Sequence, residues 1–249
     1  MINTISSVPF MGYTIFNGDL NQISFTKKTL INTINQYSFC IAEEDMEFKT
    51  ALQESDILLP DGMAVVAAVR WLRRKKIAKI AGATIHQHLL AELNQKGGRC
   101  FYLGSSEDTL TKIKDRMAIE FPNIRSASYS PPYQPQFSTT DNSIMVAAVN
   151  AFKPDVLFVG MTAPKQEKWA FAHKGQLAAP IICTIGAVFD FYAGTVARPS
   201  PFWVKIHLEW LIRLLKEPKR MWKRYLYYGP IFVKRMIQVK WNSLAEEQS

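Results

Sequence analysis

"DVLFVGMTAPKQEKWAFA", residues 155–172, joins a short apolar run to a segment with helical spacing. The run 155–161 is rich in valine, leucine and phenylalanine and ends beside a glycine, which is typical of a fully buried strand. Pro164 then stands near the first turn of the helical segment, where a proline removes no helical hydrogen bond. The stretch therefore predicts a strand that leads directly into a helix.

The same alternation recurs along the chain. Further runs that predict strands lie at residues 29–35, 56–62, 99–106 and 124–130, and the last strong apolar run is 180–191. Helical patterns follow at 63–76 and 107–121. Strands that alternate with helices indicate an α/β fold, in which a parallel sheet carries helices on both faces.

The sequence changes character at "GTVARPSP", residues 194–201, which is typical of a linker. Beyond it, apolar residues follow helical spacing at Trp203, Ile206, Trp210 and Leu214. Two prolines, Pro218 and Pro230, are expected to divide this region into two or three helices. We therefore predict a body over residues 1–195 and a C-terminal helical appendage over residues 196–249.

The positive charge of the chain is concentrated in this appendage. Residues 198–240 hold eleven of the 30 Lys and Arg residues but two of the 21 Asp and Glu residues, which leaves nineteen of each elsewhere. Residues 198–240 thus carry the whole net charge of +9, and the rest of the chain is neutral. Such local bias suits a diphosphate, an anionic membrane surface or a nucleic acid.

Other features restrict the compartment. Cys40, Cys100 and Cys183 lie in apolar surroundings without metal-ligand spacing, as expected of reduced, buried thiols. The N-terminus has no basic and apolar signal pattern, and the longest apolar run, 178–189, is too short to span a bilayer. We expect a cytoplasmic protein whose membrane contact, if any, is peripheral.

Residues that carry chemistry follow the predicted strands. Asn35, Asp61-Gly62, residues 104–106 and the loop 160–167 all come at carboxyl ends of strands, where open parallel sheets bind ligands. Several of these segments open a helix, and a helix N-terminus favours phosphate. A nucleotide or nucleotide-sugar site fits this arrangement. The chain has neither a G-x-G-x-x-G nor a Walker sequence, which argues against NAD enzymes and P-loop NTPases.

Each candidate also has a purely structural interpretation. Asp61 is either an N-cap of the following helix or a general base at the strand end. Asn35 is by default a turn residue, and Gln166 with Glu167 by default forms a solvated first helical turn. His86 and His88 are two residues apart and have no third ligand nearby, and no Asp-x-Asp pair occurs, so we predict no metal.

Four blocks together resemble the WecG/TagA/CpsF glycosyltransferases, glycosyltransferase family 26. They are "INQYSFCIAEEDMEF…LLPDG" (34–62), "APKQEKW" (163–169), "IGAVFDFYAG" (185–194) and "HLEWLIRLLKEPKRMWKRYL" (207–226). The resemblance implies a Rossmann-like body and a C-terminal appendage that contacts the membrane and completes the active site. It implies metal-independent, inverting transfer from a UDP-sugar to a polyprenyl-diphosphate-linked sugar at the inner face of the bacterial cytoplasmic membrane.

The resemblance also assigns roles to residues. Asp61 becomes the catalytic base, and the diphosphate of the donor meets arginines of the appendage. The residues implied to bind substrate are Thr33, Asn35, Lys79, Gln166, Asp190, Arg213, Arg220 and Arg224. No cofactor and no nucleic acid is expected, and assembly of further copies into a homo-oligomer is left open.

Some positions depart from the pattern of the family. Lys79 stands where arginine is common, Thr162 where glycine is common, and the segments 130–135 and 198–201 also differ. The departures gather around the expected donor site, so the sugar stays open between N-acetylmannosamine and a hexose such as glucose. Two alternatives also stay open: a nucleic-acid-binding module, which would not need UDP, and another nucleotide-dependent α/β enzyme.

Overall fold

The computed structural model describes residues 6–196, 203 and 209–246, and for residues 209, 213, 220 and 243–246 it describes the backbone alone. An eight-stranded sheet forms the centre, in the order β1-β2-β4-β3-β8-β7-β5-β6. Neighbouring strands are parallel except for the antiparallel pair β1–β2. The strands are β1 (Ser7–Phe10), β2 (Tyr13–Phe16), β3 (Thr29–Ile34), β4 (Ile57–Pro60), β5 (Arg99–Gly104), β6 (Arg125–Tyr129), β7 (Val156–Gly160) and β8 (Ile181–Thr184). The predicted α/β sheet is confirmed.

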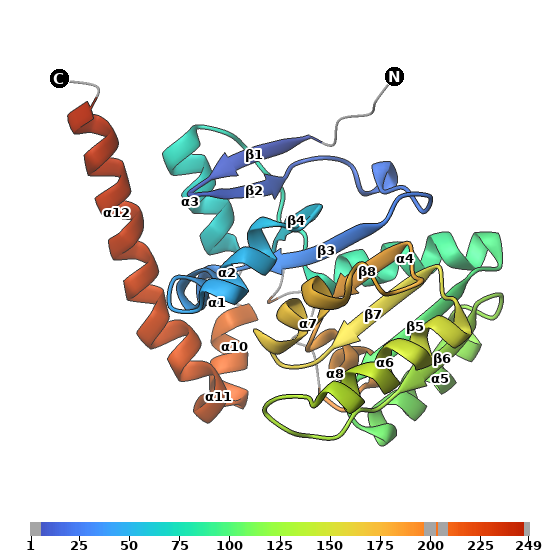
Figure 1. Cartoon of the computed structure of the whole chain (residues 1–249). Coiled ribbons are helices and arrows are strands. Elements are labelled where there is room, and N and C mark those ends of the chain that lie inside the picture. Colours follow the sequence, from blue (N-terminus) through green and yellow to red (C-terminus); the bar gives the residue numbers. More distant parts are fainter. Residues whose placement is uncertain (1–5, 197–202, 204–208, 247–249) are drawn as a thin grey trace.

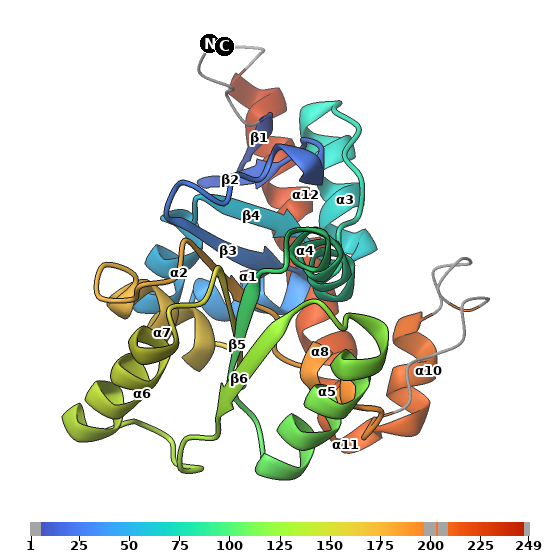
Figure 2. The same ribbon diagram turned by 90° about the vertical axis from the view of Figure 1, so that its right-hand side faces the viewer.

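Helices cover both faces of the sheet, as Figures 1 and 2 show. The helices of the body are α1 (Gln36–Ala42), α2 (Met46–Gln53), α3 (Met63–Arg73), α4 (Gly82–Lys96), α5 (Glu107–Glu120), α6 (Thr139–Phe152), α7 (Lys165–His173) and α8 (Val188–Ala193), with a 3₁₀ turn η1 (Leu20–Gln22). Helices α4, α5 and α8 share one apolar cluster with the sheet. Helices α6 and α7 pack in a cluster on the other face, and α1, α2 and α3 share a further cluster with β1, β2 and β4.

Strand β7 has no polar side chain at any position. Val156 and Phe158 point into the cluster under α4, α5 and α8, while Leu157 and Val159 point into the cluster under α6 and α7. All four side chains are fully buried. A parallel strand that is covered on both faces has no polar side, which is why the run lacks alternation.

The carboxyl ends of the central strands define the candidate site. The chain runs from β3 outward to β4 on one side, and it returns from the other side through β7 to β8. Such a reversal of strand order is where open α/β sheets bind ligands. In Figure 1 the arrowheads of β3 and β7 point toward the flank that carries the C-terminal helices.

The appendage is helical, as predicted, and consists of α10 (Glu209–Lys216), α11 (Pro218–Trp222), a π-turn η2 (Lys223–Tyr227) and α12 (Tyr228–Glu246). Pro218 opens α11 as expected. Pro230 does not end a helix but lies in the first turn of α12, where its missing N–H is tolerated. Tyr228, Phe232 and Met236, spaced four apart, are buried in the cluster of α1 and α3. Helix α12 therefore shares a hydrophobic core with the body.

Candidate functional site

Asp61 lies where β3 and β4 end side by side. Its backbone N–H donates to the carbonyl of Ile34 over 2.8 Å. The N-cap of α3 is Gly62 and not Asp61, and no side chain caps this helix, so the interpretation of Asp61 as an N-cap is wrong. Gly62 has a φ of 119°, which L-residues rarely adopt, and a Cβ there would lie 3.6 Å from the Cβ of Asn35. The strand ends thus approach closely at Asp61.

Thr33, in β3, and Asn35, directly after it, flank Ile34, to which the backbone of Asp61 hydrogen-bonds. Thr33 stands opposite Leu59 in the parallel register and is half-buried. Asn35 is the N-cap of α1, and its side-chain oxygen accepts from the N–H groups of Tyr37 and Ser38, each over 3.0 Å. The default interpretation of Asn35 as a turn residue at the strand end is therefore confirmed. The side-chain amide N–H groups of Asn35 take no part in the cap.

Lys79 reaches the same strand end from the loop between α3 and α4. The N–H of Ile80 donates to the carbonyl of Pro60 over 2.9 Å, which holds the loop one residue from Asp61. Lys79 is half-buried. The segment 63–79 thus leaves the site at the start of α3 and returns to it at Lys79.

By its default interpretation Gln166 would lie in a solvated turn, but it is buried, with 4% of its surface exposed. Its oxygen accepts from the N–H of Met161 over 3.1 Å, and its amide nitrogen donates to Glu167 over 2.8 Å. A Cβ on Gly186, just beyond β8, would lie 3.2 Å from that oxygen. The first turn of α7 is therefore packed against the end of β8, next to β3.

Glu167 is the residue that sequence reasoning missed. It is 3% exposed, and its Oε2 has no hydrogen-bond partner among the described residues. Burial raises the pKa of Glu167 to about 7, while the hydrogen bond from Gln166 and the charge of Arg224 act in the opposite direction. The next residue, Lys168, forms ion pairs with Asp45 and Glu47, at 3.1 and 2.7 Å.

Arg224 brings the appendage to the site. It lies in the π-turn η2, and its guanidinium carbon is 4.7 Å from the ring centre of Tyr37, in the first turn of α1. Its positive charge also acts to lower the pKa of Glu167 in α7. Arg213 and Arg220 lie in α10 and α11, but their side chains are outside the described part of the structure, as is the segment 198–201.

Asp190 lies in α8, which packs on the face of the sheet opposite to α7. It is half-buried in the first turn of α8, and its carbonyl accepts from the N–H of Val196 and the hydroxyl of Thr195, over 3.3 and 3.1 Å. It shares the carboxyl end of β8 with the loop of Gly186. The strand order thus places Asp190 at the same edge of the sheet as Asp61.

Two of the departures from the family pattern adjoin one another. Lys165 links them, because its N–H donates to the carbonyl of Thr162 and its ammonium donates to the carbonyl of Gln134. The same ammonium lies 3.5 Å from the ring centre of Phe137. Thr162 and the segment 130–135 therefore line one side of the first turn of α7.

The remaining titratable groups are structural. His86 is buried, and burial lowers its pKa to about 3, while its Nε2 lies 2.7 Å from the hydroxyl of Tyr102. Cys40, Cys100 and Cys183 are buried free thiols, as predicted. Within the described ranges, no three His, Cys, Asp or Glu side chains come close enough to hold a metal ion.

Comparisons with known proteins give the same family as the four sequence blocks. The profile of the WecG/TagA/CpsF family of glycosyl transferases matches residues 10–246. A Bacillus subtilis relative is 29% identical over 227 residues, which cover 90% of this chain and 86% of the relative. A Bacillus spizizenii relative is 30% identical over 200 residues, 80% of this chain and 76% of the relative. A Staphylococcus aureus relative is 25% identical over 215 residues, 86% and 82% of the two chains.

All three relatives carry the name N-acetylglucosaminyldiphosphoundecaprenol N-acetyl-β-D-mannosaminyltransferase. The family match spans the sheet, the residues at its carboxyl edge and the appendage through α12. The sequence comparisons thus place the chain with enzymes that transfer sugars. The chain belongs to the WecG/TagA/CpsF family of glycosyl transferases.

Proposed function

We propose that the enzyme transfers a sugar from a UDP-sugar to a polyprenyl-diphosphate-linked sugar, with inversion at the anomeric carbon and without a metal. The observation that carries the proposal is that two groups reach the end of β3: Asp61 follows β4 and its N–H donates to the carbonyl of Ile34, while Arg224 reaches Tyr37 in the first turn of α1 from the appendage. A carboxylate and a fixed cation are the two groups that such a displacement needs. The names of the relatives support the substrate class.

Asp61 acts as the general base in this proposal. The acceptor hydroxyl attacks the anomeric carbon of the donor, and its proton passes to the Asp61 carboxylate. The bond from that carbon to the diphosphate oxygen breaks, and UDP leaves with the electron pair. Attack from the face opposite UDP inverts the anomeric centre. Thr33 and Asn35 stand on either side of Ile34, to which Asp61 hydrogen-bonds, and in this proposal they position the sugar hydroxyls.

The leaving diphosphate needs positive charge, which Arg224 supplies together with Lys79. Backbone N–H groups at the start of α7 add partial positive charge at the same edge of the sheet. Fixed donors that face the developing charge lower the barrier because they need no reorganisation. Arg213 and Arg220 join Arg224 in this role, and Asp190 binds the nucleoside.

Gln166 holds the donor in an orientation that Glu167 determines. The carboxylate of Glu167 accepts one amide N–H of Gln166, so the second N–H has a fixed direction. The same carboxylate attracts Arg224. Glu167 therefore connects the first turn of α7 to the appendage. It positions Gln166 and Arg224, the two residues that hold the donor, without touching the reacting atoms.

The names of the relatives favour N-acetylmannosamine as the donor sugar and N-acetylglucosaminyl-diphospho-undecaprenol as the acceptor. Thr162 and the segment 130–135 depart from the family pattern beside α7, and glucose is the second candidate for that reason. These positions change which sugar is bound and leave Asp61 and Arg224 in place.

The appendage supplies a peripheral contact with the anionic inner face of the cytoplasmic membrane. No helix of the described residues is long and apolar enough to cross a bilayer. Large apolar side chains are exposed on the appendage at Trp210, Leu215, Trp222, Leu226 and Tyr227. Exposed lysines accompany them at Lys216, Lys219, Lys223 and Lys234. Aromatic and basic side chains together suit the headgroup region of a bilayer.

The proposal is tested with a panel of UDP-sugars and a short-chain, soluble N-acetylglucosaminyl diphospholipid. Mass spectrometry should detect one added sugar with UDP-N-acetylmannosamine or UDP-glucose, and NMR of the product should show the inverted anomeric centre. UDP binding separates this proposal from a nucleic-acid module. Binding of UDP without transfer from any donor in the panel would favour another nucleotide-dependent enzyme.

A further inference from the structure

The end of α3 forms a basic surface outside the appendage. Between residues 62 and 91 the chain has no Asp or Glu, and it carries six cations there: Arg70, Arg73, Arg74, Lys75, Lys76 and Lys79. The first five of these are exposed at the tip formed by the end of α3 and the residues that follow it. We call residues 70–76 the α3 tip. The low net charge of residues 1–195, which hold 19 Lys and Arg and 17 Asp and Glu, conceals this cluster because the balancing acids lie in other segments.

The charges of the α3 tip are not neutralised by the fold. Arg73 donates to the carbonyl of Pro9 over 3.0 Å, which ties the tip to β1. Within the described part of the chain, Arg70, Arg74, Lys75 and Lys76 form no ion pair. A cluster of unneutralised cations repels itself, so its natural complement is a surface of negative charge.

Trp71 adds an apolar component to the tip. It is 47% exposed although it lies on a helix whose other face packs in the core through Val65 and Val69. A half-exposed tryptophan among arginines has the character of side chains in the interfacial region of a bilayer. An exposed indole would gain nothing on a charged surface that contacts water alone.

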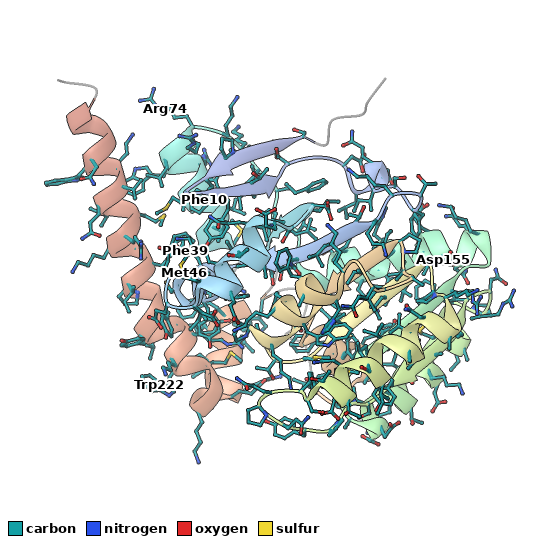
Figure 3. The ribbon with its side chains drawn as sticks, viewed as in Figure 1. Phe10, Phe39, Met46, Arg74, Asp155 and Trp222 are labelled. Atoms are coloured by element: carbon teal, nitrogen blue, oxygen red, sulfur yellow. The ribbon has the colours of Figure 1, made fainter. Side chains whose placement is uncertain are left out.

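The position of the tip agrees with a membrane on one flank of the molecule. Helix α3 contacts α12, and both share one apolar cluster. Figure 3 shows Arg74 and Trp222 on the flank along which α12 runs, Arg74 near one end and Trp222 near the other. The arrowheads of β3 and β7 point toward this flank in Figure 1. The tip and the appendage therefore lie on the side to which the strand ends open.

We infer that the α3 tip binds the surface of an anionic phospholipid bilayer, as a second contact beside the appendage. The inference rests on the proposed function, because a lipid-linked acceptor brings the enzyme to a bilayer. The eleven residues of α3 span about 16 Å, so the tip lies that far from Asp61 along the helix. Two separated contacts fix the orientation of the body, which one contact at α10–α12 would leave free to tilt.

The test uses the full chain with Arg70, Arg74, Lys75 and Lys76 changed together to Gln. Its matched control changes four exposed cations near the opposite ends of the strands and on α5: Lys27, Lys112, Lys114 and Arg125 to Gln. Both variants lose four positive charges. Binding is measured by sedimentation with vesicles of equal parts phosphatidylglycerol and phosphatidylcholine, and thermal unfolding checks that both variants are folded.

We expect the tip variant to lose at least about tenfold in vesicle affinity at low salt, and the control variant to lose far less. In wild type, the tryptophan emission should shift to the blue on binding, and Trp71→Ser should reduce that shift. Equal losses for the two quadruple variants would overturn the inference, since net charge alone would then explain binding. Unchanged vesicle affinity of the tip variant with lost affinity for a DNA duplex would overturn it in favour of a nucleic-acid surface.

Transfer to the soluble acceptor separates the inference from the proposed function. The tip variant should transfer sugar to this acceptor at close to the wild-type rate, because no substituted residue belongs to the proposed site. If wild type transfers no sugar, the proposed function fails whatever the vesicles show. If wild type transfers sugar and the tip variant binds vesicles normally, the inference alone fails.

Discussion

Glu167 is a carboxyl group in a place that disfavours its charge. It is buried beside Gln166, and one of its oxygens has no hydrogen-bond partner among the described residues. The attraction of Arg224 only partly offsets the cost of burial, so its pKa rises to about 7. The folded protein therefore takes up a proton at a pH where the unfolded chain, with a pKa near 4.5, has already lost it.

This difference determines the sign of the pH effect on stability. Between pH 4.5 and 7 the folded state binds more protons at Glu167 than the unfolded state, so this group makes stability fall as pH rises. Glu167→Gln removes the effect. From pH 5 to pH 8 the unfolding free energy of the variant should rise relative to wild type, by up to about 3 kcal/mol.

Urea unfolding at the two pH values measures this change. The control is Glu107→Gln, which alters an acid in the first turn of α5 that is exposed. It should keep the pH dependence of wild type. A Glu167→Gln variant whose unfolding free energy follows wild type at both pH values would show that burial does not perturb this carboxyl.

Arg224 is a residue of the appendage that contacts the body near the site, at Tyr37. Arg224→Ala should lower turnover about a hundredfold, the scale for loss of one fixed donor to a developing anion. Arg224→Lys should recover only part of this loss, because an ammonium cannot reproduce the planar contact with Tyr37. Lys223→Ala, on an exposed neighbour, is the control. Wild-type turnover of Arg224→Ala would leave the appendage with a role in anchoring alone.

At the scale of elements, α12 joins the appendage to α1. The rings of Phe232 and Phe39 meet edge to face with centres 5.4 Å apart, and the thiol of Cys40 donates to the carbonyl of Tyr228 over 3.7 Å. Figure 3 shows Phe39 on the side of the body that α12 covers. The division at residues 195 and 196 remains a prediction for function, but removal of α12 would expose core side chains of α1.

Phe232→Ala should therefore destabilise the whole protein. Phe232 is fully buried, and such truncations cost about 3–5 kcal/mol. Val233→Ala is the matched control, since Val233 is 55% exposed and a surface substitution costs less than about 1 kcal/mol. Denaturant unfolding compares the two. A small loss for Phe232→Ala, with one unchanged transition for the body, would mean that α12 is not part of its cooperative unit.

The elements also show what the sequence could predict. Strands β3, β4, β5, β7 and β8 are apolar runs because both faces of the sheet are covered, and this pattern is visible in sequence. The hairpin β1–β2 was not predicted, because its strands have four residues each and its turn uses Met11, with a φ of 49°, beside Gly12. The π-turn η2 has no sequence signal either, although such turns often lie at functional sites.

For the site, position along a strand was more informative than residue type. Asp61, Thr33 and Asn35 could be placed together because strands in a parallel sheet end at one edge. The burial of Glu167 could not be predicted, since an acid in a first helical turn normally faces solvent and favours the helix dipole. It lies where α2 packs against α7, a tertiary contact that no local pattern encodes.

At the scale of the whole molecule, the positive charges that the proposed function uses lie in three places. The carboxyl edge of the sheet, the α3 tip and the appendage lie toward one flank, so a membrane-bound diphosphate would meet cations there. Because arginines and helix N-termini provide this charge, transfer should not need a divalent ion. We expect activity to survive EDTA. Loss of activity in chelator, with recovery on addition of magnesium or manganese, would contradict the metal-independent mechanism.

The most direct test of the account is the turnover of Asp61→Asn with saturating donor and the soluble lipid-diphosphate acceptor. Asparagine keeps the size of the side chain but cannot take a proton. Turnover should fall about a hundredfold or more, while calorimetry should find the UDP affinity of wild type, because Asp61 acts on the acceptor hydroxyl. Near wild-type turnover of Asp61→Asn would contradict the assignment of the base, and with it the mechanism built at the ends of β3 and β4.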